Sequence, residues 1–517
     1  MKLLRSALLL LGAVLYCLHF KHLRADFPNF SPWMDWAKYT DEGWYGDAAI
    51  RFYLRGTWHL PGDFNPGAAL PVWPLLEALV FRFTGVGIVA ARALAVALFG
   101  GIIISGYHLV RAVLPFGALS KEVREVFAAA AAVLLAASSF LFAFSRMAIL
   151  EPLLVLWLLL ALLLASTLRG GMKGARRYLA LVGVGLLTAL MIGTKTTAMF
   201  LLPSICCMLW AGAGKNLRRS ILDTSVAACA ALLPAALYYL LLRRGGYLQD
   251  VRYLFTANAY TAITPQTFWS IVWQAVSDGL WIGPLLFFAA LFALFAAGMS
   301  RRAWTDPVFS SLVLWVVGYL AYIAYHANLQ PRYYFVVAVP LVLLLGRSAM
   351  HLQVSFRQAP LLLAPLALVL LATEAFHTLH YVRHPEYSYQ EAALKVGRIV
   401  ESQPAHSHTV LSISGSNLSL MTGLPSICDD FGTLDLEDRI AVYKPGWFVT
   451  WNYVEDDKMQ ALSRFYQLTR IAALPAMDDP ERNLMIVYRL DAKDGVAPRR
   501  RKPNRMVGAP PKQSTRI

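Results

Sequence analysis

Long apolar runs separated by short polar connections make up most of the chain up to residue 376. Many of these runs are long enough to cross a bilayer as helices, since about 20 apolar residues span its hydrocarbon core. We predict about eleven spans, at residues 4–20, 86–113, 126–144, 150–167, 178–192, 197–213, 222–242, 279–299, 308–326, 333–346 and 360–376. The pattern therefore predicts an all-α polytopic membrane bundle.

Basic residues are distributed unevenly between the two sets of short connections. With a cytoplasmic N-terminus, the cytoplasmic set holds Lys2, Arg5, Arg111, Lys121, Arg124, Arg169, Lys173, Arg176, Arg177, Lys215, Arg218, Arg219, Arg301, Arg302, Arg347 and Arg357. The short external connections hold only Arg146, Lys195 and Arg332. Because Lys and Arg favour cytoplasmic connections, this bias predicts a cytoplasmic N-terminus. An odd number of spans then places the C-terminal region outside, and the first span is expected to be an uncleaved signal anchor.

The organisation follows from these spans. Residues 1–376 form the predicted transmembrane domain, with a first external loop at 21–85 and a second large external loop at 243–278. Residues 377–497 are predicted to form a small soluble extracytoplasmic α/β domain, with helical patterns at 389–400 and 455–468 and strand-like runs at 409–413, 447–452 and 483–489. The basic, Pro-rich segment 498–517 is expected to be disordered.

Composition and charge narrow the class of protein further. Hydrophobic residues make up 57% of the 517 residues and charged residues only 15%, against about 25% charged in soluble domains. This excludes a soluble multidomain enzyme, a disordered protein and a fibrous repeat. The net charge of +16 would suggest nucleic acid in a soluble protein. Here membrane orientation accounts for the basic residues, so no nucleic-acid partner is expected.

The first external loop contains an acidic pair at the start of a helical pattern. Asp41 and Glu42 precede apolar residues spaced as on one face of an amphipathic helix, which is expected to lie on the membrane surface. A helix N-terminus favours the ionised carboxylate, which is the state that a general base needs in order to accept a proton from a hydroxyl. A simple helix cap with a solvated acid remains the alternative.

Three further charged residues lie in the short external connections. Glu151 stands at the start of the fourth predicted span, where it is either a helix N-terminal acid or a functional group. Lys195 and Arg332 are cations on the side that the charge bias disfavours. Binding a phosphate at the external leaflet would explain both of them, and snorkelling to lipid headgroups is the alternative.

Metal-binding patterns are weak in this sequence. The three histidines at positions 377, 380 and 384 share a possible helix face, but their position next to a predicted span favours interfacial anchoring. Asp429, Asp430 and Asp435 are interpreted as a polar turn rather than a calcium site. We therefore expect no metal site and no cofactor, although a divalent metal remains possible.

Taken in order, these motifs resemble the membrane glycosyltransferases that use polyprenyl-phosphate sugars. This superfamily, called GT-C, includes the protein O-mannosyltransferases and the aminoarabinose transferases of lipid A modification. The matching elements are Asp41-Glu42 with Tyr45 and Ala48, the helix from Pro71 to Gly85 followed by Ala91-Arg92, the stretch from Arg146 to Glu151-Pro152, Thr194-Lys195-Thr196, and Arg332-Tyr333 with Pro340. They cover about the first 350 residues, and the ordered set is more specific than any single motif.

The resemblance implies a GT-C bundle with its site at the external face and a sugar transfer with inversion. The donor would be a polyprenyl-phosphate sugar, and the acceptor a lipid, a glycan or a protein. Asp41 would be the general base and Glu42 would orient it. Glu151 stands where the family usually has Asp-Pro, so both substrate positioning and catalysis remain open for it. Lys195 and Arg332, with Tyr333, would hold the donor phosphate. The resemblance also implies a bacterial-type cytoplasmic membrane.

The chemistry supports this interpretation independently of the family. The leaving polyprenyl phosphate gains negative charge as the glycosidic bond breaks, and preorganised cations at that oxygen stabilise the transition state. Two other functions remain alternatives: a transporter or flippase for a lipid-linked sugar, and a non-catalytic envelope assembly protein. A transporter is expected to show inverted repeats and ionisable residues near the membrane midplane, which the sequence does not indicate. The sequence does not name the sugar or the acceptor.

Overall fold

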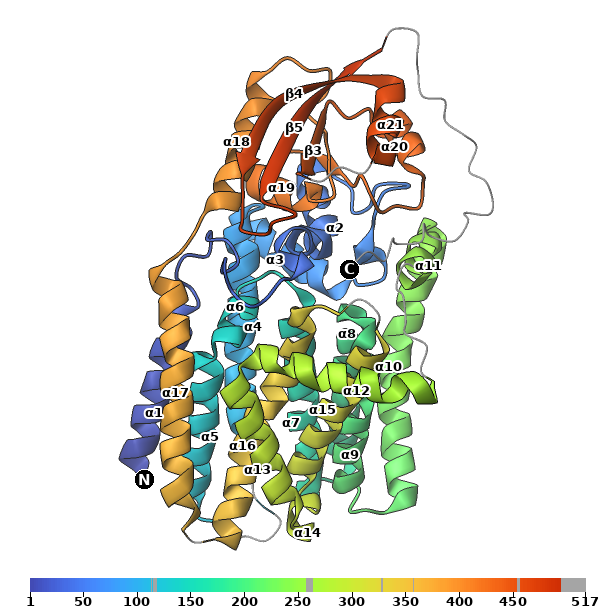
Figure 1. Ribbon diagram of the computed structural model, residues 1–517. Helices are drawn as coiled ribbons and strands as arrows, with labels where there is room; N and C mark the ends of the chain where they lie inside the picture. Colours follow the sequence, from blue (N-terminus) through green and yellow to red (C-terminus); the bar gives the residue numbers. More distant parts are fainter. Residues whose placement is uncertain are drawn as a thin grey trace.

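The computed structural model describes residues 1–493 apart from residues 113, 115–118, 257–263, 327–328, 357 and 453–455. The predicted basic tail at 498–517 and Arg357 therefore lie outside the described residues. Figure 1 shows two regions: a layer of long helices that contains the N-terminus, and a sheet with its helices stacked on one end of that layer. We call this end of the helical layer the domain end and the opposite one the far end.

The apolar runs form the helices of the bundle. They are α1 (Lys2–Leu18), α4 (Ile88–Val110), α5 (Lys121–Ala137), α6 (Ser139–Ser145), α7 (Leu150–Thr167), α8 (Gly174–Thr194), α9 (Leu202–Gly212), α10 (Leu217–Gly245), α13 (Pro284–Gly298), α14 (Arg301–Trp304), α15 (Pro307–Tyr325), α16 (Phe335–Ser355) and α17 (Ala359–Arg383). Three short 3-10 helices join them: η3 (Leu168–Gly170), η4 (Thr196–Leu201) and η6 (Pro331–Tyr334).

Hydropathy and length identify the helices that can cross a membrane. Within the described ranges, seven helices pass both criteria, or up to nine if each of two bent helix pairs counts as one span. The helices α1, with 17 residues, and α9, with 11, are shorter than a full span. The polytopic membrane fold is thus confirmed, while the count of about eleven spans stays a prediction.

One bent pair has a clear physical cause. The sequence pattern predicts one continuous span at 126–144, but α5 and α6 meet at 62°. At the break, Glu374 on α17 accepts a hydrogen bond of 3.0 Å from the backbone N–H of Ser139. The Ser138 hydroxyl accepts another from Leu141 N–H, at 3.3 Å, so the first N–H groups of α6 have partners. The break directs the chain into residues 146–149, which lie beside the site described below.

The two large loops predicted at 21–85 and 243–278, with the first residues of the span predicted at 279–299, fold into short helices at the domain end. They are η1 (Trp36–Lys38), α2 (Asp41–Arg55), η2 (Pro66–Ala68), α3 (Val72–Thr84), α11 (Leu248–Thr256), α12 (Pro265–Ser277) and η5 (Asp278–Ile282). The amphipathic helix expected at the membrane surface is α2, but most of it is buried between α3 and the C-terminal domain. Its polar face is covered as well, because the C-terminal domain packs on it.

The C-terminal domain contains a five-stranded mixed sheet with the strand order β2-β1-β3-β5-β4. Its elements are α18 (Ser388–Ser402), β1 (Val410–Leu411), α19 (Gly415–Thr422), β2 (Ser426–Ile427), α20 (Leu436–Tyr443), β3 (Trp447–Trp451), α21 (Asp456–Phe465), β4 (Tyr466–Pro475) and β5 (Leu484–Ala492). The strand β1 pairs in parallel with β2 and β3, and β5 runs antiparallel to β3 and β4. The helix expected at 455–468 ends at Phe465, because the residues that follow pair with β5.

Buried helix α16 lies at the centre of the bundle, with 94% of its apolar window inside the protein. It packs against α5, α13 and α15. The 3-10 helix η6 leads directly into it, so the residues of η6 are carried into the middle of the domain end. The first turn of α7 and the connection from α8 to η4 reach the same end of the bundle. Together with η6, these two segments position the site.

Candidate active site

Asp41 is the first residue of α2, and its carboxylate is buried. The hydroxyl of Thr40 donates a hydrogen bond of 2.8 Å to Asp41 Oδ1. Asp41 Oδ2 lies 2.8 Å from Arg332 Nη2. Tyr45, one turn further along α2, is half-buried, and loss of solvent raises the pKa of its phenol well above the ordinary value. Asp41 is thus ion-paired at a helix start, where a negative charge is favoured.

Arg332 lies between two carboxylates. Besides Asp41, its guanidinium pairs with Asp35, which is buried just before η1. Asp35 Oδ2 also accepts a hydrogen bond of 2.8 Å from the backbone N–H of Arg332. Burial raises the pKa of Asp35, and the neighbouring Arg332 opposes that shift. The Asp35 carboxylate therefore holds both the side chain and the main chain of Arg332 in position.

Tyr333 connects Arg332 to the second cation. The guanidinium of Arg332 lies 4.9 Å from the centroid of the Tyr333 ring, and Lys195 Nζ lies 4.3 Å from it, both within cation–π distance. Lys195 in turn pairs with Glu151 in the first turn of α7. Burial lowers the pKa of Lys195, and the Glu151 carboxylate opposes that shift.

The contacts bring together five of the six residues that the sequence predicts for the site: Asp41, Glu151, Lys195, Arg332 and Tyr333. All five are buried. The other oxygen of Glu151, Oε2, is buried without a hydrogen-bond partner. A buried unsatisfied carboxylate oxygen is costly, so this atom is available to a ligand that donates a hydrogen bond.

Glu42, the sixth predicted residue, points to a different part of the molecule. Its carboxylate forms two bonds with Arg92 on α4, Oε1 to Nε at 2.8 Å and Oε2 to Nη2 at 2.6 Å. The backbone N–H of Ala148 also donates to Glu42, at 2.9 Å. Because successive helix residues point about 100° apart, Glu42 faces α4 while Asp41 faces Arg332. The geometry gives Glu42 contacts that hold α2 in place rather than contacts with Lys195 or Arg332.

The C-terminal domain holds α2 from its other side. The backbone N–H of Gly43 donates a hydrogen bond of 2.5 Å to Asn417 Oδ1 on α19, and Trp44 Nε1 donates to the carbonyl of Ile413 at 3.1 Å. A Cβ atom at Gly43 would lie 2.2 Å from the backbone nitrogen of Asn417. Since no side chain fits at that distance, glycine is needed for this contact.

A buried ion network fixes the second half of α2. Arg51 pairs with Asp47 at 2.8 Å and with Asp63 at 2.5 Å. Asp63 also accepts a hydrogen bond of 3.0 Å from the backbone N–H of Cys428 in the C-terminal domain. Burial raises the pKa of Asp47 to about 6. The network links α2, the loop after it and the C-terminal domain.

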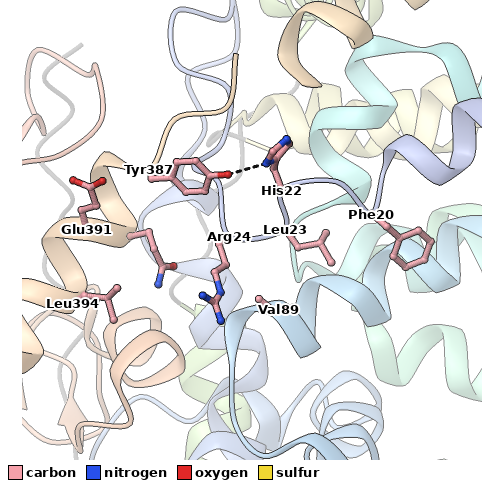
Figure 2. A pocket seen from close by; sticks show the side chains of 9 residues that line it. Phe20, His22, Leu23, Arg24, Val89, Tyr387, Glu391 and Leu394 are labelled. Atoms are coloured by element: carbon pink, nitrogen blue, oxygen red, sulfur yellow. Dashed lines mark hydrogen bonds between the residues drawn. The ribbon is translucent and has the colours of Figure 1, made fainter. Parts of the chain in front are cut away.

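A separate hollow of about 580 Å³ lies where the first loop leaves α1. Figure 2 shows His22 directed toward Tyr387, with a hydrogen bond of 2.8 Å between His22 Nδ1 and the tyrosine hydroxyl. Phe20 and Arg24 line it from the loop, and Val89 from the start of α4. None of the six predicted site residues lines this hollow.

Several residues of this arrangement were not predicted. Asp35 has no local motif around it, and Asn417 contacts Gly43 from hundreds of residues away in sequence. Asp63 pairs with the nearby Arg51, but its contact with the C-terminal domain is equally long-range. Arg92 belongs to the family motif, but nothing local indicates that it pairs with Glu42. The close approach to the backbone at Gly43 comes from α19 and is not indicated by the residues around Gly43 in the sequence.

The carboxylates of the cluster are not grouped as metal ligands in the described part of the chain. Over the ranges that the structure describes, no group of three or more His, Cys, Asp or Glu side chains is arranged to hold a metal ion. Asp35, Asp41 and Glu151 each pair with Arg332 or Lys195. The cluster is thus built from alternating carboxylates and cations.

The fold and this cluster define a polytopic membrane protein with a buried charged site between its bundle and a small domain. No family model and no curated protein matches the sequence. Among solved structures, the chain is similar to ArnT from Cupriavidus metallidurans bound to undecaprenyl phosphate, with 13% identity and a TM-score of 0.64 over 93% of this chain and 98% of that one. The apo form of the same protein gives a TM-score of 0.60, also with 13% identity, over 93% and 97%.

The oligosaccharyltransferase of Archaeoglobus fulgidus in complex with Zn and sulfate is also similar. It shares 11% identity with a TM-score of 0.54, over 94% of this chain and 73% of that chain. At these identities the likeness concerns the fold. The chain therefore shares the overall fold of these two membrane proteins.

Proposed function

We propose that this protein transfers a sugar from a polyprenyl-phosphate-linked donor to an acceptor hydroxyl at the external face of a membrane, with inversion at the anomeric carbon. The observation that supports the proposal most is the ion pair of 2.8 Å between Asp41 and Arg332. It places a carboxylate that can accept a proton beside a cation that can bind a phosphate. The GT-C fold and its neighbours, one of which is bound to undecaprenyl phosphate, support the same class of donor.

In the proposed reaction, Asp41 acts as the general base. The acceptor hydroxyl gives its proton to the Asp41 carboxylate while its oxygen forms a bond to the anomeric carbon. The bond from that carbon to the phosphate oxygen breaks, and both electrons leave with the polyprenyl phosphate. A single displacement of this kind inverts the configuration. The acceptor is a lipid, a glycan or a protein, and the sugar is a hexose or a pentose.

Arg332 and Lys195 stabilise the leaving phosphate, with Tyr333 between them. The phosphate gains one negative charge in the transition state, so fixed cations at its oxygens favour the transition state over the bound donor. Asp35 supports this role because it anchors Arg332 independently of Asp41. When the phosphate binds, Arg332 shifts its contact from Asp41 to the phosphate, and the Asp41 carboxylate becomes free to accept a proton.

Glu151 and Glu42 have positioning roles in this proposal. Glu151 orients Lys195 by their ion pair, and its unpartnered Oε2 can accept a hydrogen bond from a sugar hydroxyl. Glu42 holds the start of α2 against α4 through Arg92. The C-terminal domain covers α2, and we propose that it lies outside the membrane.

The test compares cells that express the wild-type protein with cells that express Asp41→Asn. Mass spectrometry of envelope lipids and glycoproteins measures the sugar that depends on this gene. We expect Asp41→Asn to reduce it by about 10²–10⁴-fold, the usual contribution of a general base. The control is Asp457→Asn, at an exposed acid on α21. Near-normal transfer by an inserted and folded Asp41→Asn protein would reject the assignment.

A further inference from the structure

A second hollow lies at the far end of the bundle, opposite the proposed site. Its volume is about 860 Å³, and α4, α5, α7 and α8 enclose it. The start of α5 lies at this end in Figure 1. The hollow is therefore separated from the carboxylate cluster by the length of the bundle.

Cations line one side of this hollow. Arg111 follows α4, and Lys121 and Arg124 lie in the first turn of α5. Glu125 also lines it, but Arg5 on α1 pairs with that carboxylate at 2.6 Å. Arg111 lies further from Glu125, at 3.8 Å. The hollow therefore has three cations and only one carboxylate. A fourth cation, Arg5, already neutralises that carboxylate.

The guanidinium of Arg124 is only partly satisfied. Its Nη1 donates to the carbonyl of Arg111 at 3.1 Å, while its Nε is buried with no hydrogen-bond partner. A buried donor of this kind is costly unless a ligand accepts from it. An anionic oxygen in the hollow would satisfy Arg124 and would also offset the repulsion among Arg111, Lys121 and Arg124.

The other side of the hollow is apolar. Leu160, Leu163 and Leu164 line it from α7, and Leu187 lines it from α8. Both helices are long and apolar enough to cross a membrane, so this wall continues into the hydrocarbon layer. A small soluble anion would leave the leucine wall uncovered, whereas a lipid would cover it with its acyl chains.

We propose that this hollow binds one anionic phospholipid, with its phosphate at Arg124 and Lys121 and its acyl chains along the leucines of α7. Basic pockets between transmembrane helices bind anionic headgroups by the same combination of charge and apolar surface. The bound lipid would connect α4 and α5 to α7 and α8 at the far end. It does not depend on the proposed transfer reaction.

Native mass spectrometry of the full-length protein in mild detergent tests the proposal, with phosphatidylglycerol and phosphatidylcholine added separately. The wild type is expected to retain phosphatidylglycerol in preference to phosphatidylcholine. The double variant Lys121→Ala/Arg124→Ala is expected to bind phosphatidylglycerol about tenfold more weakly. The matched control is Arg218→Ala/Arg219→Ala, which removes the same charge from exposed positions at the start of α10.

A second variant keeps the charge and fills the space. Leu163→Trp leaves every cation in place but occupies the apolar side of the hollow, so it is also expected to weaken phosphatidylglycerol binding. Equal binding of the two lipids to the wild type would overturn the proposal. An equal loss in the Arg218/Arg219 control, or displacement of the lipid by millimolar inorganic phosphate, would overturn it as well.

Discussion

The backbone N–H of Gly43 donates a hydrogen bond of 2.5 Å to the side-chain carbonyl of Asn417, across more than 370 residues of sequence. This bond joins the helix that begins with Asp41 to the C-terminal domain. Since Glu42 ties the same turn to Arg92 on α4, the first turn of α2 is held from two sides. The position of the proposed base therefore depends on both the bundle and the domain.

Asn417→Ala is expected to lower the turnover of the lipid-linked donor by about 10–100-fold, because a small displacement of a catalytic group costs about this much. The Michaelis constant for the donor is expected to change little, since Glu151, Asp35 and Asp41, which pair with Lys195 and Arg332, lie outside α19. Steady-state kinetics separates the two parameters. Asn452→Ala, an exposed position in the same domain, is the control, and a turnover equal to that of the control would show that the bond does not position Asp41.

Gly43→Ala is expected to lower the midpoint of thermal unfolding, because the added Cβ would meet the Asn417 backbone at 2.2 Å. Overpacking of this kind commonly costs about 1–3 kcal/mol. Gly87→Ala is the matched control, since a Cβ at that position meets no atom within 4 Å. Circular dichroism of the detergent-solubilised proteins measures the midpoints. Equal midpoints for the two variants would contradict the close packing of α2 on α19.

Arg332→Ala is expected to raise the Michaelis constant for the lipid donor and to lower kcat/KM by about 10²–10³-fold, the effect of removing one stabilising donor from an anionic transition state. Arg332→Lys keeps the charge but loses the geometry that bridges Asp35 and Asp41, so partial recovery is expected. Arg176→Ala, at an exposed residue of α8, serves as the control. An unchanged donor constant in Arg332→Ala would remove this residue from phosphate binding.

Glu77 on α3 provides a test of pH dependence. It is fully buried, and this burial raises its pKa well above the usual value, although a side-chain hydrogen bond with Trp73 opposes the shift. The folded protein therefore holds a proton that the unfolded chain releases, and stability falls as pH rises through the window above the ordinary carboxyl pKa. Glu77→Gln does not titrate.

The unfolding midpoint of Glu77→Gln is therefore expected to exceed that of the wild type at pH 8, with the difference disappearing near pH 4. Thermal scans at several pH values measure it. Glu401→Gln, at an exposed acid of α18, should show no such trend. A wild-type midpoint that rises with pH relative to Glu77→Gln would mean that Glu77 is ionised in the folded protein.

Chelation of divalent metals is expected to leave the transfer rate unchanged. In the proposed site, Lys195 and Arg332 supply the positive charge that the phosphate needs, and each carboxylate of the cluster pairs with one of them. The assay compares turnover before and after incubation with EDTA. A loss of activity that Mg²⁺ or Mn²⁺ restores would show that the reaction uses a metal in addition to these cations.

Much of the bundle was predictable from local sequence. The span predicted at 150–167 coincides with α7, and the span predicted at 308–326 differs by one residue at each end from α15. Apolar runs of this length have few alternatives in a bilayer, because every backbone N–H and C=O must be bonded within the segment. The break between α5 and α6 was not predictable, because Glu374 on α17 provides the partner that permits it.

The C-terminal domain was predicted less completely. Strand β4 lies where the helical pattern at 455–468 ends, and its pairing with β5 determines its structure. Helix α19, which packs on Gly43, has no strong periodic pattern. Short elements of this kind depend on tertiary partners, and local propensity is a weak guide to them.

The sequence by itself determined the helical bundle, the charge bias of its connections and the residue types of the site. The reason is that hydropathy and charge are properties of each segment and do not depend on its tertiary partners. Only the tertiary structure decided that Asp41 faces Arg332 while Glu42 faces Arg92, and that Asn417 holds the turn between them. These pairings depend on the distances and directions between side chains from separate helices. Such distances follow from packing of the whole chain rather than from any one segment.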